Sequence, residues 1–200
     1  MPNPTIPITS DVFIDRGQPT VNFNAVGNCN VRLLYISSTK TECSRSLLYA
    51  AIPPEIAVAE IYKAELRLRW FIEGSAGAAA TLYRVTQEAW TEAGATWNKY
   101  DGVTNWTLAG GDYDTTEKVQ FTVQGPLTAR RWQEIDITTW LIDIINNHSR
   151  NAHMLLRLDD ESAGVNTGGV FVDGEIAGGS EWERPHIVIV RPPFGQPVVV

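Results

Sequence analysis

A run of alternating side chains at residues 62–72 constrains the fold of this chain more than any other feature. Charged residues fill the positions between apolar ones, at Lys63, Glu65, Arg67 and Arg69. The apolar positions are Tyr62, Ala64, Leu66, Leu68, Trp70 and Ile72. Because successive side chains of a strand point to opposite faces, this run predicts an antiparallel strand that is buried on one face and solvated on the other.

Shorter runs of the same type recur along the chain, separated by Gly, Pro, Asn and Asp. They are residues 12–14, 31–36, 46–49, 81–86, 119–123, 133–137, 154–158, 170–172 and 186–190. About ten strands with such turns predict an all-β fold, an antiparallel β-sandwich or jelly roll.

One segment, residues 138–146, has helical rather than strand periodicity. Trp140, Leu141, Ile144 and Ile145 fall on one helix face. Thr138 or Asp136 is expected to cap the helix N-terminus. A helix of two or three turns is too short to be stable alone, so we expect it to close one end of the sandwich.

The length of 200 residues fits one domain. The first ten residues and residues 192–200 are rich in proline, which predicts extended arms flanking a domain at residues 11–191. The start of the chain shows neither the basic residues nor the apolar stretch of a signal peptide, and no apolar run is long enough to span a bilayer. We therefore expect a protein made in the cytoplasm without a signal peptide, with no membrane partner.

The charge balance argues against nucleic acid as a partner. The chain has 16 Lys and Arg against 23 Asp and Glu, a net charge of -7. Nucleic acids and anionic membranes are bound through clustered basic residues, and the chain has only one local basic pair, Arg130 and Arg131.

Cys29 and Cys43 are too few for a disulfide scaffold and lack the spacing of metal ligands. We interpret them as reduced interior side chains, and a single bridge between them stays open.

Oxygen-bearing side chains suggest two candidate calcium sites. Asp11, Asp15, Asn22 and Asn24 form one group, and residues 159–161 form the other. Surface carboxylates and Asx turns are the competing and favoured interpretation of both groups. The only cofactor that we consider is therefore a structural calcium ion.

Tryptophan and tyrosine concentrate between residues 90 and 113. We interpret Trp90 and Trp97 as framework residues. Tyr100, Trp106 and Tyr113 lie in a Gly-, Asp- and Asn-rich stretch, where aromatic rings could stack on sugar rings. These three residues are the candidate ligand-binding set.

Carboxylates for acid–base catalysis are plentiful, but no spacing pairs them, and no nucleophile elbow, phosphate loop or histidine metal motif is present. The candidates are Glu88, Glu92, Asp112, Asp114, Glu161 and Glu175. We therefore predict that the chain is not an enzyme.

Several short motifs resemble those of DNRLRE (disaggregatase-related repeat) domains between about residues 11 and 191. They are DVFID at 11–15, NFN at 22–24, RSLLY at 45–49, IPP at 52–54, AELRL at 64–68, LYRVT at 82–86, WTE at 90–92, TWN at 96–98, EIDIT at 134–138, LLR at 155–157 and ERPHIVI at 183–189. The resemblance implies a jelly roll similar to carbohydrate-binding modules, usually non-catalytic and attached to secreted or cell-surface proteins. This chain differs in carrying essentially one module and no signal peptide.

Two functions follow as hypotheses. The first is a structural or adhesive β-sandwich of a bacteriophage virion, a capsid decoration or fibre protein. It would assemble through its terminal arms with further copies or with capsid or tail proteins, and its place would be the virion or an extracellular surface. The alternative is a carbohydrate-binding module that targets a polysaccharide. A small polysaccharide-active enzyme is a third, weaker hypothesis.

Overall fold

The computed structural model describes residues 3–26, 28–37, 40–70, 77–123, 131–162, 167–172 and 184–192. Within these ranges the chain forms eleven strands, one α-helix and two short 3-10 turns, Asn24–Val26 and Val58–Glu60. The strands and the helix are β1 (Thr5–Pro7), β2 (Ser10–Asp15), β3 (Asn28–Ser37), β4 (Lys40–Ala51), β5 (Lys63–Trp70), β6 (Ala79–Val85), β7 (Tyr113–Thr122), β8 (Arg131–Asp136), α1 (Thr138–Asn147), β9 (Asn151–Leu158), β10 (Thr167–Val172) and β11 (His186–Val190).

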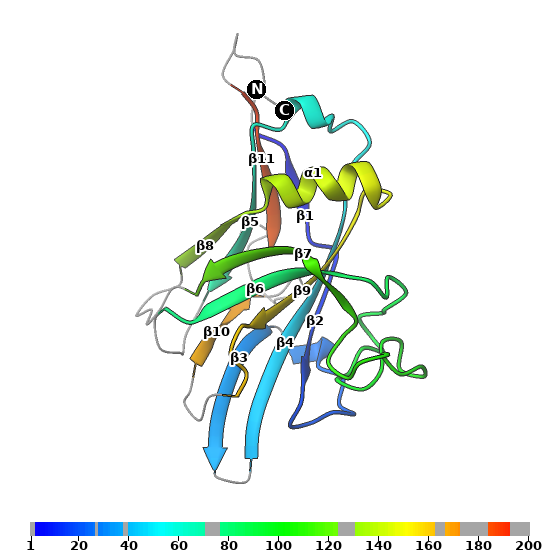
Figure 1. Ribbon diagram of the computed structural model, residues 1–200, viewed down its shortest axis with the longest axis vertical. Coiled ribbons are helices and arrows are strands. Elements are labelled where there is room, and N and C mark those ends of the chain that lie inside the picture. The colour runs from blue at the N-terminus through cyan, green and yellow to red at the C-terminus, as the bar shows by residue number, and fades with distance from the viewer. Residues whose placement is uncertain are drawn as a thin grey trace.

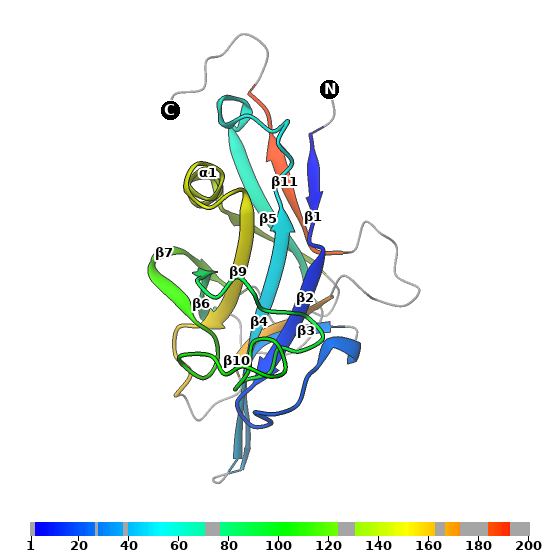
Figure 2. The ribbon, with the colours of Figure 1, turned by 90° about the vertical axis from the view of Figure 1, so that its right-hand side faces the viewer.

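The strands form two antiparallel layers that are joined through β3 and β10 (Figure 1). In the first layer β4 pairs with β2 on one edge and with β9 on the other, and the order continues through β6 to β7. In the second layer β5 lies between β11 and β8, and β1 adds to the outer edge of β11 (Figure 2). The all-β antiparallel sandwich predicted from the sequence is confirmed.

Within β5 the alternating run behaves as its pattern predicts, but the predicted buried position Tyr62 precedes the strand and is 59% exposed, and Ile72 lies outside the described residues. Its even-numbered side chains, from Ala64 to Trp70, are 0–2% exposed and join one hydrophobic core that both layers share. The Trp70 indole meets the Phe171 ring edge-on at 5.4 Å, so β10 is fastened to β5 by aromatic packing. The odd-numbered, charged positions lie on the outer face of the second layer, where Lys63, Arg67 and Arg69 are partly exposed and Glu65 is buried.

Helix α1 occupies the predicted position and packs against β5, β9 and β7. Trp140, Leu141 and Ile144 are buried. The cap differs from the expectation, because the residue at the cap position is Ile137, which makes no side-chain cap hydrogen bond. Asp136 lies one position earlier, and its carboxylate accepts hydrogen bonds from the Thr138 amide at 3.0 Å and hydroxyl at 2.6 Å.

The N-terminal arm is partly folded onto its own chain. β1 pairs with β11, and the Ile6 and Ile8 side chains are only 1% and 6% exposed. Proline suits this edge position because an edge strand leaves backbone groups unpaired. The expectation that this arm lies against other chains is therefore not supported for residues 5–8. In the C-terminal arm, residues 193–200 lie outside the described residues.

In the described part of the chain, no helix is long and apolar enough to cross a membrane.

Candidate functional site

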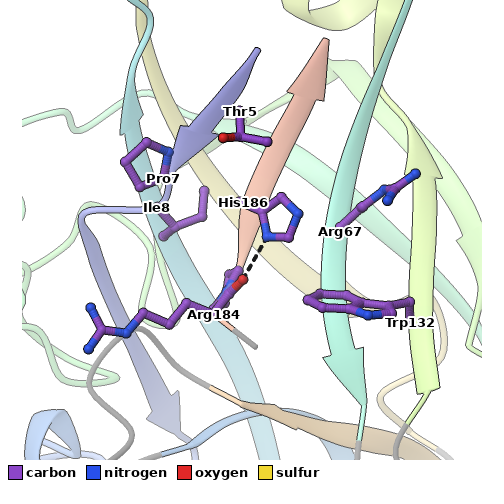
Figure 3. A pocket seen from close by; sticks show the side chains of 8 residues that line it. Thr5, Pro7, Ile8, Arg67, Trp132, Arg184 and His186 are labelled. Carbon is purple, nitrogen blue, oxygen red and sulfur yellow. Dashed lines mark hydrogen bonds between the residues drawn. The ribbon is translucent and has the colours of Figure 1, made fainter. Parts of the chain in front are cut away.

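An open cleft lies on the outer face of the second layer, between the edge strand β1 and β8 (Figure 3). Its volume is about 710 Å³, within the range of about 300–1,000 Å³ that is usual for ligand sites. Its lining residues are Thr5, Pro7, Ile8, Arg67, Trp132, Arg184, Pro185 and His186.

Strand register explains why these side chains meet. His186 on β11 lies opposite Arg67 on β5, and Arg69 lies opposite Trp132 on β8. Because opposed residues share a sheet face, Arg67, Trp132 and His186 all point outward, from three neighbouring strands. The floor of the cleft is thus built on strands, while Ile8, Arg184 and Pro185 line it from the segments next to β1 and β11.

The Trp132 indole is half-buried and is held by two neighbours. The His186 ring meets it edge-on, with centroids 5.2 Å apart, and the Arg69 guanidinium lies 5.7 Å from its centroid. An aromatic ring fixed in this way, and still partly exposed, offers a flat apolar surface for a ligand to stack on.

Several charged side chains in and beside the cleft pair with one another. Arg67 bonds to Glu65 at 2.8 Å and lies 3.1 Å from Glu134, while Lys63 bonds to Glu65 at 2.6 Å. Burial alone would raise the pKa of Glu65, but the hydrogen bonds from Lys63 and Arg67 outweigh it and lower that pKa. Glu65 is therefore an ionised carboxylate that orients Arg67. The other arginine of the cleft, Arg184, is exposed.

The His186 ring is oriented by the backbone. Its Nδ1 lies 2.8 Å from the Arg184 carbonyl oxygen. A carbonyl oxygen can only accept, so Nδ1 carries a proton and Nε2 is left to accept a hydrogen bond in the neutral ring.

The aromatic residues predicted to bind sugar occupy different surroundings. Trp106 is only 4% exposed, and its indole nitrogen donates to the Thr96 carbonyl at 2.9 Å. Tyr100 is half-buried, with its ring edge-on to Trp106 at 5.7 Å. Trp106 lies in the connection between β6 and β7, as its sequence neighbourhood indicated, but these contacts bury it and leave little surface to offer a ligand.

Tyr113 contacts neither Tyr100 nor Trp106 among the interactions of the described residues but packs elsewhere. It is half-buried, packs on Tyr83 at 4.6 Å, and its hydroxyl accepts a hydrogen bond from Arg157 at 2.5 Å. The structure therefore brings Tyr100 and Trp106 together but gives Tyr113 separate partners.

The framework interpretation of the other tryptophans is supported by burial. Trp90 and Trp97 are each 7% exposed, and Trp70 and Trp140 are 2% and 6% exposed. We call the Trp- and Tyr-rich residues 90–113 the aromatic segment. The indole nitrogen of Trp90 donates to Nδ1 of His153 at 3.0 Å, which holds the start of this segment to β9.

In the first candidate calcium group, both aspartates are buried. Asp15 accepts hydrogen bonds from the Gly17 amide at 2.6 Å and the Ser44 hydroxyl at 2.5 Å. Asp11 accepts a hydrogen bond from the Cys29 thiol at 3.5 Å. These carboxylates hold β2 to neighbouring segments.

One of the two asparagines of that group, Asn22, bonds to the aromatic segment. The Asn22 amide donates to the carbonyls of Glu92 and Ala95, both at 2.8 Å, and its oxygen accepts from the Asn24 amide at 3.1 Å. Calcium at Asp11, Asp15, Asn22 and Asn24 stays a prediction. It would be supported if a chelator lowered the melting temperature and calcium restored it.

The three residues of the second candidate calcium group, 159–161, each bond to a different partner. Asp159 accepts from the Thr81 hydroxyl at 2.5 Å, and Asp160 accepts from the Ser162 amide at 2.8 Å. Glu161 is paired with Arg45, whose Nη1 also donates to the Gly110 carbonyl at 2.7 Å.

The carboxylates considered for catalysis have structural partners. Glu92 accepts from the Asp11 amide at 3.4 Å, and Asp112 accepts from the amides of Thr107 and Leu108 at 2.9 and 2.8 Å. Glu175 lies outside the described residues.

Both cysteines are fully buried thiols that form no disulfide with each other, in agreement with their interpretation as reduced interior residues.

Sequence reasoning missed the cleft because it assigned the lining residues to separate parts of the chain. It placed Thr5, Pro7 and Ile8 in the N-terminal arm, Arg67 and His186 in two different strands, and Trp132 in no element. A signal was nevertheless present, since the alternation of β5 places Arg67 and Arg69 on one outer face and Trp132 follows the Arg130–Arg131 pair. The pairing of β8 and β11 with the two edges of β5, however, cannot be predicted from the pattern of residues within each strand.

One layer of this antiparallel β-sandwich thus carries an open cleft lined by an indole, an imidazole and two guanidinium groups. The chain belongs to carbohydrate-binding module family 96, whose model matches residues 3–167. No curated protein matches the chain. This family match supports a jelly-roll carbohydrate-binding domain, the kind of domain that the DNRLRE resemblance implied. It favours the alternative hypothesis, a carbohydrate-binding module, and gives no support to a virion component.

Proposed function

We propose that the protein is a non-catalytic module that binds a polysaccharide in the cleft between β1 and β8. The family match supports carbohydrate binding, and the observation that carries the location is the half-exposed Trp132 ring beside Arg67 and His186. The Trp132 ring would stack on the apolar face of a sugar, while the arginine and the histidine bond to its polar edge.

The cleft also has the features that favour an acidic sugar. The chain as a whole carries a net charge of -7, yet the cleft gathers two arginines, Arg67 and Arg184. Glu65 and Glu134 neutralise Arg67 in part, so the exposed Arg184 supplies the main attraction. A guanidinium matches a carboxylate or sulfate with two parallel hydrogen bonds.

Affinity electrophoresis through gels containing neutral or acidic polysaccharides tests this function. Trp132→Ala should weaken binding by roughly two- to tenfold, the value of one aromatic contact. Arg184→Gln should weaken binding to acidic glycans selectively, and added salt should have the same effect.

Tyr62→Ala is the matched control, because Tyr62 is a 59% exposed aromatic residue of the same layer that does not line the cleft. The location would be refuted if Tyr62→Ala weakened binding as much as Trp132→Ala did. The function itself would be refuted if the unmodified chain ran unretarded in every gel.

A further inference from the structure

Three metal-ligating side chains converge where α1 meets β7, away from the cleft. They are Glu117 of β7, Asp143 of α1 and His148, which ends α1, and we call them the His148 cluster. One ligand atom from each lies within 4.8 Å of the others. His148 Nε2 lies 3.2 Å from Glu117 Oε2 and 3.4 Å from Asp143 Oδ2.

The histidine nitrogen is the distinctive member. Nε2 of His148 is buried and makes no hydrogen bond within the described residues, although both carboxylate oxygens are near. A buried polar atom without a partner is costly, so its position between two oxygens needs an explanation. A bound cation supplies one, because a neutral imidazole and two carboxylates would all direct lone pairs at it.

The spacing fits a small transition-metal ion. Zinc binds histidine nitrogen and carboxylate oxygen at about 2.0–2.2 Å, so two ligands at a tetrahedral angle lie about 3.4 Å apart. The two distances from Nε2 agree with that value.

Neighbouring groups orient the carboxylates and leave negative charge in excess. The Asn147 side-chain amide donates to the other oxygen of Asp143 at 2.6 Å, whereas Arg84 Nε donates to Oε2 of Glu117, the same oxygen that faces His148 and that has a second lone pair to offer. Arg84 also lies 3.7 Å from Glu88 and 3.8 Å from Asp114. One guanidinium thus faces three carboxylates and Asp143 adds a fourth, which a divalent cation would help to neutralise.

We infer that the His148 cluster binds a divalent transition-metal ion, with Zn²⁺ as the best fit, through Glu117, Asp143 and His148. The remaining coordination positions would be filled by water, as in sites with three protein ligands. Such an ion would clamp the end of α1 to β7.

Calorimetric titration of the chelator-treated chain, purified without a histidine tag, with ZnCl₂ tests the inference. We expect one ion per chain, and a visible absorption band of Co²⁺ that Zn²⁺ displaces. His148→Gln and Asp143→Asn should each weaken zinc binding by at least about tenfold, since even outer-shell changes cost about 10- to 100-fold. Glu60→Gln, which changes a carboxylate paired with Arg191, is the control and should bind like the unmodified chain.

No saturable binding by the unmodified chain would overturn the site, as would unchanged affinity in both cluster variants. Asp143 is 41% exposed, so Asp143→Asn decides the question if His148→Gln fails to fold. Polysaccharide retention is a separate readout, because none of these residues lines the cleft.

Discussion

The guanidinium of Arg45 holds both carboxylate oxygens of Glu161, with Nε 2.8 Å from Oε1 and Nη2 2.7 Å from Oε2. The two side chains are only 9% and 10% exposed. The guanidinium carbon of Arg45 also lies 4.7 Å from the centre of the Trp97 ring. This ion pair therefore links β4, the aromatic segment and the end of β9 in the interior.

Glu161→Gln should destabilise the fold by about 3 kcal/mol at neutral pH, because it leaves a buried guanidinium without its charge partner. Urea unfolding measures the change. Glu134→Gln is the control, since Glu134 also pairs with an arginine but is 51% exposed, and it should cost less than about 1 kcal/mol.

The same pair predicts a pH dependence. Burial would raise the pKa of Glu161, but Arg45 and then Arg157 outweigh burial and lower that pKa. A lowered pKa in the folded state contributes stability that is complete above the unfolded value, about 4.3, and is lost as pH falls through the folded value. The stability difference between the unmodified chain and Glu161→Gln should thus be constant near neutrality and shrink below about pH 4.3. A constant difference across the whole acid range would contradict this assignment.

The Trp90–His153 hydrogen bond makes a prediction for histidine titration. Burial lowers the pKa of His153, and its Nδ1 must stay unprotonated to accept the indole hydrogen. Trp90→Phe removes that donor, so the pKa of His153 should rise toward its ordinary value, as an NMR titration of the imidazole would show. The titrations of His148 and His186 serve as internal controls. An unchanged His153 titration would mean that burial alone sets its pKa.

The cysteines should be unreactive in the native state. Burial, followed by the charge of Glu161, raises the pKa of Cys43 to about 12, and Cys29 is equally buried. Because the thiolate is the reactive form, a disulfide-exchange reagent at neutral pH should label neither residue until the chain unfolds. Both thiols should then react in denaturant without prior reduction, whereas two missing thiols would reveal a bridge.

Gly94 should not tolerate a side chain. A Cβ atom there would overlap the Asp101 carbonyl group and lie 2.6 Å from the Gly102 nitrogen. Gly94→Ala should therefore displace the segment that carries Tyr100 and Trp106 and lower stability by about 1–3 kcal/mol, measured by thermal melting with tryptophan fluorescence. An unchanged melting curve would show that the segment adapts freely.

Elements with strong periodicity could be predicted from the sequence, but the side chains that these elements bring together in the folded chain could not. The alternation of β5 and the apolar face of α1 were predicted because each element buries one face of its own pattern. Trp106 was misjudged because its polar sequence neighbours suggested a surface loop, whereas the folded segment covers its ring. Trp132 entered the cleft through the pairing of β8 with β5, a relationship between distant segments that local sequence does not encode.

The pairing of β1 with β11 has a mechanical consequence. Thr5 lies opposite Val188 and Pro7 lies opposite His186, so the outer ends of both strands leave the sheet at the same end of this ladder. A force that separates these two ends would load the backbone hydrogen bonds one after another, since they run perpendicular to the strands. Under tension the edge should peel open like a zipper instead of resisting by shear, and β1 would detach first from the wall of the cleft.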